Sequence, residues 1–149
     1  MDRLSGRQLP DYAELHCLSN FTFLRGASHP GELITRAIEL GYKALAITDE
    51  CSFSGLVRAH VAARGSNLKL IVGSECRFSD GFRLVILATD RSSYGDLSRL
   101  VSHARRAAEK GSYTLHRTDL ETHAPRGCIA LWLPSPEDGP ADGAWLRAL

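Results

Sequence analysis

The chain has 149 residues, the length of one ordinary domain. Its 44% hydrophobic and 23% charged residues are close to globular averages, which excludes a disordered, collagen-like or disulfide-stapled chain. The formal net charge of +1 provides no global field to attract nucleic acid or an anionic membrane. No apolar run approaches the roughly 20 residues that span a bilayer, and the N-terminus lacks a signal-peptide core, so we expect a cytoplasmic protein that does not contact membranes.

Short apolar runs alternate along the chain with segments of helical periodicity. Unbroken apolar runs are typical of strands covered on both faces. An apolar stripe that follows Ser28 as N-cap and Pro30 in the first turn, and stops at Gly41, predicts the first helix. Ser52 or Ser54 would cap the second helix. The expected strands lie at residues 12–18, 44–47, 68–72, 82–88 and 128–133, and the expected helices with their caps at residues 28–41, 52–65 and 96–110, with a short helix near Asp119.

Strands that alternate with helices predict right-handed βαβ units, and hence an α/β fold with parallel strands. The sheet would be either open and doubly wound or part of a barrel. A complete eight-fold barrel needs about 250 residues, so a barrel here would be truncated, with an unpaired apolar edge on its last strand. We expect an N-terminal tail at residues 1–11, the domain at 12–134, and a truncated Pro/Gly-rich tail at 135–149 that is mostly loop.

Polar side chains follow three of the expected strands. His16, Asp49 and Glu75 lie at or just beyond the carboxyl ends of these strands. In parallel α/β folds those ends converge and carry the chemistry. One imidazole and two carboxylates suit a divalent cation that activates water on a phosphate ester. The three residues are therefore candidate metal ligands.

Simpler interpretations exist for the same residues. Asp49 and Glu75 could cap helices, and His16 could hydrogen-bond a neighbouring loop. Three cysteines lie nearby, namely Cys17, Cys51 and Cys76. We predict that they are small buried hydrophobic residues, and the alternative is that their thiolates bind a softer metal.

The expected third helix carries basic residues on one face, namely Arg99, Arg105, Arg106 and Lys110. They could contact a phosphate backbone or form a solvated outer face. The lack of interleaved aromatic residues for stacking on single strands favours the solvated face.

Four segments resemble a known family. Residues 14–28 (ELHCLSNFTFLRGAS), 46–51 (AITDEC), 71–75 (IVGSE) and 84–90 (LVILATD) are similar to the N-terminal PHP (polymerase and histidinol phosphatase) domain of bacterial family C DNA polymerases. The similarity is strongest to the error-prone branch of the polymerase III α subunit. It covers about residues 12–134 and implies part of a distorted (βα)7 barrel whose strand ends hold divalent metals.

The resemblance also implies a degenerate metal site. His16, Asp49 and Glu75 match family ligands, whereas other ligand positions fall on Leu18, Glu50, Arg25, Arg83 and the region of Pro134. A guanidinium cannot ligate a metal and would instead pair with Asp49 or Glu75, so we expect an ion-pair network. At most one weakly bound divalent metal would remain, held by His16, Asp49 and Glu75, and no other cofactor is expected.

By resemblance the chain is a fragment of an error-prone DNA polymerase that acts in translesion synthesis and DNA repair. The family's three catalytic aspartates lie in a palm downstream of this region, so the fragment's own role would be structural. The implied partners are the palm and thumb of the polymerase, replication or mutasome proteins, and DNA through the parent polymerase. The alternatives are a stand-alone metal-dependent phosphoesterase and an interaction module that docks a replication partner.

Overall fold

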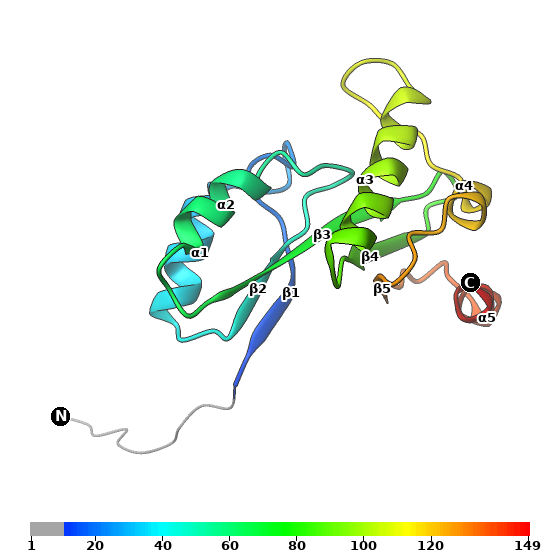
Figure 1. Ribbon diagram of the computed structural model, residues 1–149. Coiled ribbons are helices and arrows are strands. Elements are labelled where there is room, and N and C mark those ends of the chain that lie inside the picture. The colour runs from blue at the N-terminus through cyan, green and yellow to red at the C-terminus, as the bar shows by residue number, and fades with distance from the viewer. Residues whose placement is uncertain (1–10) are drawn as a thin grey trace.

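One five-stranded sheet, in the order β1-β2-β3-β4-β5, organises the structure, a computed structural model that describes residues 11–149 (Figure 1). The expected tail at residues 1–11 lies almost entirely outside the described residues. The strands are β1 (Ala13–Cys17), β2 (Ala44–Ile47), β3 (Lys69–Arg77), β4 (Arg83–Leu87) and β5 (Ile129–Trp132). The helices are α1 (Pro30–Glu39), α2 (Leu56–Ala63), α3 (Arg91–Arg106), α4 (Arg117–Thr122) and α5 (Pro140–Ala148).

The long strand β3 joins two halves of the sheet. Its first residues pair in parallel with β2, and residues from Gly73 onward pair antiparallel with β4. Figure 1 shows α1 and α2 beside the β1–β3 half, and α3 and α4 beside the β3–β5 half. The middle of β3, at Val72 and Gly73, therefore lies where the two halves meet, and Glu75 follows two residues later.

The expected α/β architecture is confirmed, but the parallel arrangement is corrected for β4 and β5, which both pair antiparallel. A tight turn at Ser79–Gly81 joins β3 to β4, with Gly81 at φ +92° and Asp80 Oδ1 accepting a 3.1 Å hydrogen bond from the Phe82 amide. So short a connection reverses the chain, because a parallel crossover needs a dozen or more residues.

Local capping chemistry sets the helix starts. The N-cap of α1 is His29 rather than Ser28, and the Glu32 carboxylate accepts a 2.7 Å hydrogen bond from the His29 amide. Helix α3 begins earlier than the expected residue 96, because Asp90 caps it through a 2.8 Å bond from the Ser93 amide. The N-cap of α2 is Gly55, and not Ser52 or Ser54.

The segment after Pro134 contains more regular structure than its prolines and glycines indicate. Helix α5 starts at Pro140, a residue well suited to the first helical position, and the Asp142 carboxylate accepts a 2.7 Å hydrogen bond from the Gly139 amide. Trp145 and Leu146 of α5 pack against the main core. The sequence predicts mostly loop here, and the structure corrects that prediction.

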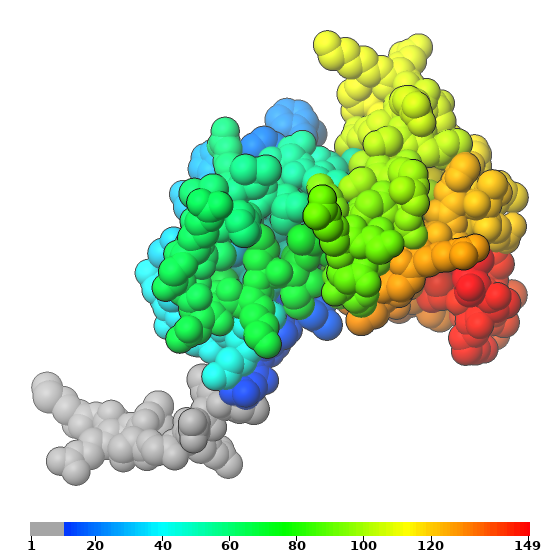
Figure 2. All heavy atoms as spheres, in the orientation of Figure 1, coloured from blue at the N-terminus to red at the C-terminus, as the bar shows by residue number. Residues whose placement is uncertain are grey.

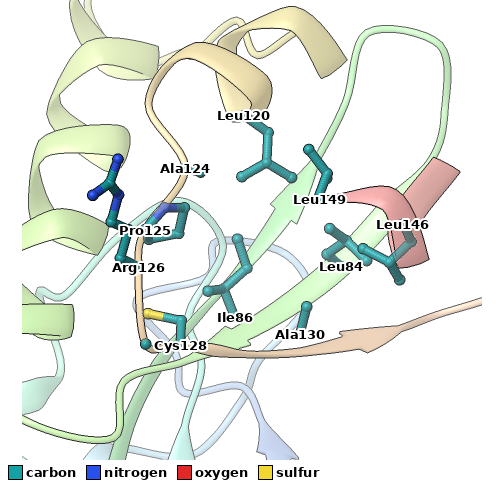
Figure 3. A pocket seen from close by; sticks show the side chains of 11 residues that line it. Leu84, Ile86, Leu120, Ala124, Pro125, Arg126, Cys128, Ala130, Leu146 and Leu149 are labelled. Carbon is teal, nitrogen blue, oxygen red and sulfur yellow. The ribbon is translucent and has the colours of Figure 1, made fainter.

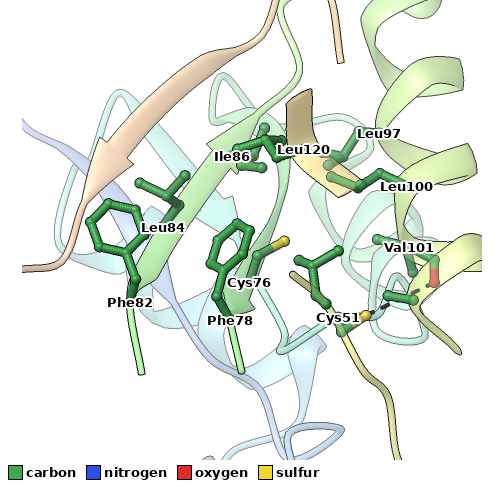
Figure 4. Packing of buried hydrophobic residues seen from close by; sticks show 12 residues of the cluster. Cys51, Cys76, Phe78, Phe82, Leu84, Ile86, Leu97, Leu100, Val101 and Leu120 are labelled. Carbon is green, nitrogen blue, oxygen red and sulfur yellow. Dashed lines mark hydrogen bonds between the residues drawn. The ribbon is translucent and has the colours of Figure 1, made fainter. Parts of the chain in front are cut away.

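Two apolar clusters hold the helices on the sheet. The larger lies between β3, β4 and the helices α3 and α4, and includes Cys76, Phe82, Ile86, Leu97 and Leu100 (Figure 4). The second lies under α1 and α2 and includes Ile34, Ala37, Leu45 and Ile47. A fully buried Leu or Phe side chain contributes roughly 1.5–3 kcal/mol, so these clusters fix the strand ends in space. Among residues 11–149, no helix is long and apolar enough to span a membrane.

Candidate functional site

A fully buried carboxylate, Glu75 on β3, lies at the centre of the candidate site. His16 Nε2 hydrogen-bonds Glu75 Oε2 at 2.7 Å. Arg25 donates from Nη1 to Glu75 Oε1 at 2.8 Å and from Nη2 to Oε2 at 3.1 Å. This is a bidentate ion pair, in which two N–H groups of one guanidinium bind the two oxygens of one carboxylate. Such pairs are among the strongest that arginine forms. Both oxygens of Glu75 are thus engaged by donors.

The same arginine reaches a second carboxylate. Arg25 Nη1 also donates to Glu50 Oε2, and the other oxygen of Glu50 accepts a 2.6 Å hydrogen bond from the Tyr113 hydroxyl. Arg105 Nε donates at 2.9 Å to the carbonyl of Cys51, and its Nη2 donates at 3.2 Å to the carbonyl of Glu50. The result is a continuous network from β1 through β3 to the connection after α3.

This network changes the protonation behaviour of its members. Burial raises the pKa of Glu75, but the hydrogen bonds and positive charges of His16 and Arg25 outweigh burial and bring the pKa to about 2, from the usual 4.5. The hydrogen bond to Glu75 raises the pKa of Arg25 further above its ordinary value. Burial, reinforced by Glu50, raises the pKa of Tyr113, so its hydroxyl stays a donor. Glu75 is therefore ionised and paired over the whole physiological range.

Asp49, at the end of β2, belongs to a separate hydrogen-bond set. Its carboxylate accepts bonds from the Ser19 amide at 2.8 Å, the Ser19 hydroxyl at 2.7 Å and the Thr22 hydroxyl at 2.7 Å. These three bonds attach the loop after β1 to the end of β2. Asp49 is buried and serves as an anchor for this loop.

The loop after β1 is folded so that Arg25 points inward. Leu24 adopts φ +63°, a left-handed conformation that is uncommon for leucine, and its side chain is 89% exposed. A Cβ on Gly26 would lie 2.0 Å from the Ser19 carbonyl oxygen, so only glycine fits at this close approach. A strained backbone conformation such as that of Leu24 persists where the surrounding contacts impose it. Here the folded loop places the Arg25 guanidinium against Glu75.

The structure brings together two of the three candidate ligands. His16 and Glu75 touch, whereas Asp49 is engaged by Ser19 and Thr22. Within residues 11–149, no group of three His, Cys, Asp or Glu side chains is placed to hold a metal ion. Three hydrogen bonds fill three of the roughly four lone-pair sites of each carboxylate, Glu75 and Asp49, so these residues, as arranged, do not fit a multi-metal centre. Binding of one weak metal stays a prediction.

The predicted ion-pair network is confirmed for Arg25 and Glu75. No ion pair of Arg83 or of Asp49 occurs in the described part of the chain. Sequence reasoning missed the contributions of Glu50, Tyr113 and Arg105. Glu50 could have been found from its position next to Asp49, but nothing in the sequence points to Tyr113, which is 63 positions away from Glu50.

The other candidates take structural positions. The cysteines are free, and burial raises the pKa of Cys17 and of Cys51 to about 11, so both are neutral thiols at physiological pH. Arg105 points inward to backbone carbonyls, which removes it from the basic face of α3.

An apolar hollow of about 430 Å³ lies between β4, β5, α4 and α5 (Figure 3). Its lining includes Leu84, Ile86, Leu120 and Leu146, and among residues 11–149 no Asp, Glu or His side chain takes part in it. Such a lining offers no carboxylate or imidazole side chain for acid–base or metal chemistry, so this hollow is not the candidate site.

The fold and the strand-end site define the class of protein. The PHP domain family matches residues 14–146, and the chain belongs to that family. It is 61% identical over 142 residues to an error-prone DNA polymerase from Dechloromonas aromatica, and 55% identical over 136 residues to one from Pseudomonas aeruginosa. These matches cover 93% and 91% of this chain, but 14% and 13% of the two polymerases.

Two solved structures share the fold. A putative metal-dependent phosphoesterase from Bifidobacterium adolescentis has a TM-score of 0.54 at 24% identity, over 66% of this chain and 35% of that protein. An amidohydrolase from Chromobacterium violaceum, with bound sulfate and no metal, has a TM-score of 0.53 at 28% identity, over 64% of this chain and 34% of that protein. The expected partial PHP-type barrel is thereby confirmed.

Proposed function

We propose that this chain is part of an error-prone DNA polymerase and serves it as a scaffold whose metal site is degenerate. The names and identities of the polymerase relatives support the first half of the proposal. One observation supports the second: the Arg25 guanidinium occupies both oxygens of Glu75 and also pairs with Glu50. A cation at this place would have to displace a positively charged side chain from a buried carboxylate.

In this role the network replaces metal bridging with ion pairs. It joins the loop after β1, the ends of β2 and β3 and the connection after α3, which are the segments a strand-end metal cluster would otherwise hold. DNA synthesis, translesion activity and the partners of the whole polymerase belong to the longer chain. We expect the isolated chain to extend a DNA primer no more than a control without protein does.

Metal content and hydrolysis test the scaffold role. The purified chain is incubated with Zn²⁺, Mn²⁺ or Fe²⁺, desalted and measured by mass spectrometry for bound metal, and in parallel assayed on p-nitrophenyl phosphate. We expect well under one equivalent of metal and no turnover above the blank. Asp49→Ala provides the control, since a genuine phosphoesterase would lose turnover with it.

The alternative function, a metal-dependent phosphoesterase, is favoured by the description of the Bifidobacterium protein alone. Two or more bound metals, together with hydrolysis that Asp49→Ala abolishes, would establish the alternative and overturn the scaffold proposal. The His16–Glu75–Arg25 geometry opposes it, because His16 and Arg25 already satisfy the carboxylate.

A further inference from the structure

A hollow of about 300 Å³ lined by arginine and histidine side chains lies on the outer face of α3, away from the strand-end network. The residues of helix α3 are the green to yellow-green spheres on the face of the molecule seen in Figure 2. Two guanidinium groups, two imidazoles and two serine side chains line the hollow, and no carboxylate from residues 11–149 does. The lining residues of this α3 hollow are Ser98, Arg99, Ser102, His103, Arg106 and His123.

The helix repeat produces this concentration of donors. Arg99, Ser102, His103 and Arg106 are spaced i, i+3, i+4 and i+7, so they share one face of α3 over about 10 Å of helix axis. The ring of His123, which follows α4, lies 4.7 Å from that of His103. Arg99 and Arg106 are exposed on this face. The hollow is therefore accessible to a large ligand.

One hydroxyl beneath the hollow has no protein partner. The Ser98 hydroxyl is buried and makes no hydrogen bond within the described residues. Buried hydroxyls are normally satisfied, so this one calls for a local partner such as a water. Its oxygen is closed to solvent and does not itself contact a ligand in the hollow.

The neighbouring carboxylates are placed beside the hollow. Asp96 pairs with Arg99 and accepts a 3.2 Å hydrogen bond from the Arg126 amide. Asp119 lies 3.1 Å from His103 Nε2. Asp96 and Glu121 line a second hollow that shares Arg99 and His123 with the first. Asp96 thus competes with any bound anion for Arg99. Removing the charge of Asp96 should therefore strengthen anion binding.

We propose that the α3 hollow binds the phosphate backbone of duplex DNA, an inference that rests on the proposed polymerase membership. Guanidinium groups and hydroxyls are typical donors to phosphate oxygens, and such contacts position a protein without reading sequence. Among the described residues the lining contains no Phe, Tyr or Trp on which the bases of a single strand would stack, so the charge density of duplex DNA is the better match. Because the net charge of the chain is only +1, the attraction is local to α3.

Salt-dependent DNA binding tests this proposal. Fluorescence anisotropy of a labelled 20-base-pair duplex is measured between 50 and 200 mM salt for the unmodified chain, for Arg99→Ala/Arg106→Ala, and for Arg36→Ala/Arg64→Ala. Arg36 and Arg64 are exposed residues on the α1–α2 side, so the control double variant removes the same charge elsewhere. Loss of two phosphate contacts should lower affinity about tenfold or more and reduce the slope of log K against log salt by about 1.8.

A gain-of-affinity variant makes the test independent of damage to the fold. Asp96→Asn releases Arg99 while retaining an oxygen for the Arg126 amide, so it should tighten duplex binding. Equal weakening by the two double variants, or no change with Asp96→Asn, would overturn the proposal. Displacement of the duplex by about 10 mM inorganic phosphate at constant ionic strength would identify a small-anion site instead. None of these outcomes affects the scaffold proposal, which depends on metal content and hydrolysis.

Discussion

At the scale of single residues, the stability of the site depends on neutralising Glu75. A buried carboxylate is costly unless charge and hydrogen bonds compensate it. His16 satisfies one oxygen, and Arg25 satisfies both and carries the opposite charge. The side chain of Arg25 is 37% exposed, so solvent screens part of the pair.

Arg25→Leu is therefore expected to lower the free energy of unfolding by about 2 kcal/mol, below the 3–5 kcal/mol for a fully buried broken pair. The measurement is urea denaturation at pH 7. Arg36→Leu, which removes the exposed partner of Glu39, is the control and should cost about 0.5 kcal/mol or less. An equal decrease in the free energy of unfolding for the two variants would show that the buried pair stabilises the fold no more than the exposed pair does.

Acid should weaken the fold through the same carboxylate. The pKa of Glu75 is about 2 in the folded chain and 4.5 ordinarily, so the unfolded chain binds the extra proton first as the pH falls. The stabilisation is complete above pH 4.5 and is lost progressively between about 4.5 and 2. Glu75→Gln removes this group, so its free energy of unfolding should fall less steeply over that interval. Parallel curves for the two proteins, measured by denaturation at several pH values, would contradict this assignment.

At the scale of secondary-structure elements, Arg117 joins α4 to α5 and to the β3–β4 turn. Its guanidinium carbon lies 4.3 Å from the Phe82 ring centroid and 4.8 Å from that of Trp145. It also pairs with Asp80 and Asp142, each at 2.6 Å. One planar cation thus combines stacking and ion pairing, which a lysine cannot reproduce.

Arg117→Ala should release α5 selectively. We expect amide hydrogen exchange to accelerate over residues 140–148, while α1 exchanges as before, and the free energy of unfolding to fall by about 1–2 kcal/mol. Arg117→Lys should give an intermediate effect because it keeps charge without the stacking plane. Arg64→Ala, at the end of α2, serves as the control. Uniform acceleration across the whole chain would mean that α5 is not a separate unit.

The elements that the sequence predicted best are those with local signals. Buried apolar runs predicted the strands, and Pro30 and Gly41 predicted α1 to within a residue or two. The direction of β4 was not predictable from its composition, because buried strands of parallel and antiparallel sheets can have the same apolar sequence. The residue types of Gly73–Glu75 predict a loop, but these residues pair with β4 and belong to a strand.

The candidate site shows the same division between local and long-range information. His16 and Glu75 were predicted from their positions at strand ends, and the Arg25 pair from the chemistry of guanidinium. The separate anchoring of Asp49 depends on the fold of the loop after β1, where Leu24 has a positive φ and Gly26 lies close to the Ser19 carbonyl. No periodicity encodes such a loop, so only the structure could reveal it.

At the scale of the whole molecule, both outer strands of the sheet pair on one side only within residues 11–149: β1 with β2, and β5 with β4. Unpaired strand edges are templates for association unless charge or cover protects them. Ile129 on β5 is 53% exposed and adds apolar surface to such an edge. Because the sheet does not close within residues 11–149, β5 offers a stretch of backbone to which a second chain can add.

We therefore expect the chain to self-associate reversibly at about 100 μM, and Ile129→Lys to suppress this because a charge on an edge strand opposes strand addition. Sedimentation velocity across a concentration series provides the measurement. The matched control is Val57→Lys, which puts the same charge on a residue that is 71% exposed on α2, away from any strand edge. If Val57→Lys suppresses association as strongly as Ile129→Lys, net charge rather than the β5 edge controls it. If only Ile129→Lys acts, the open edge of the sheet is the surface through which the molecule associates.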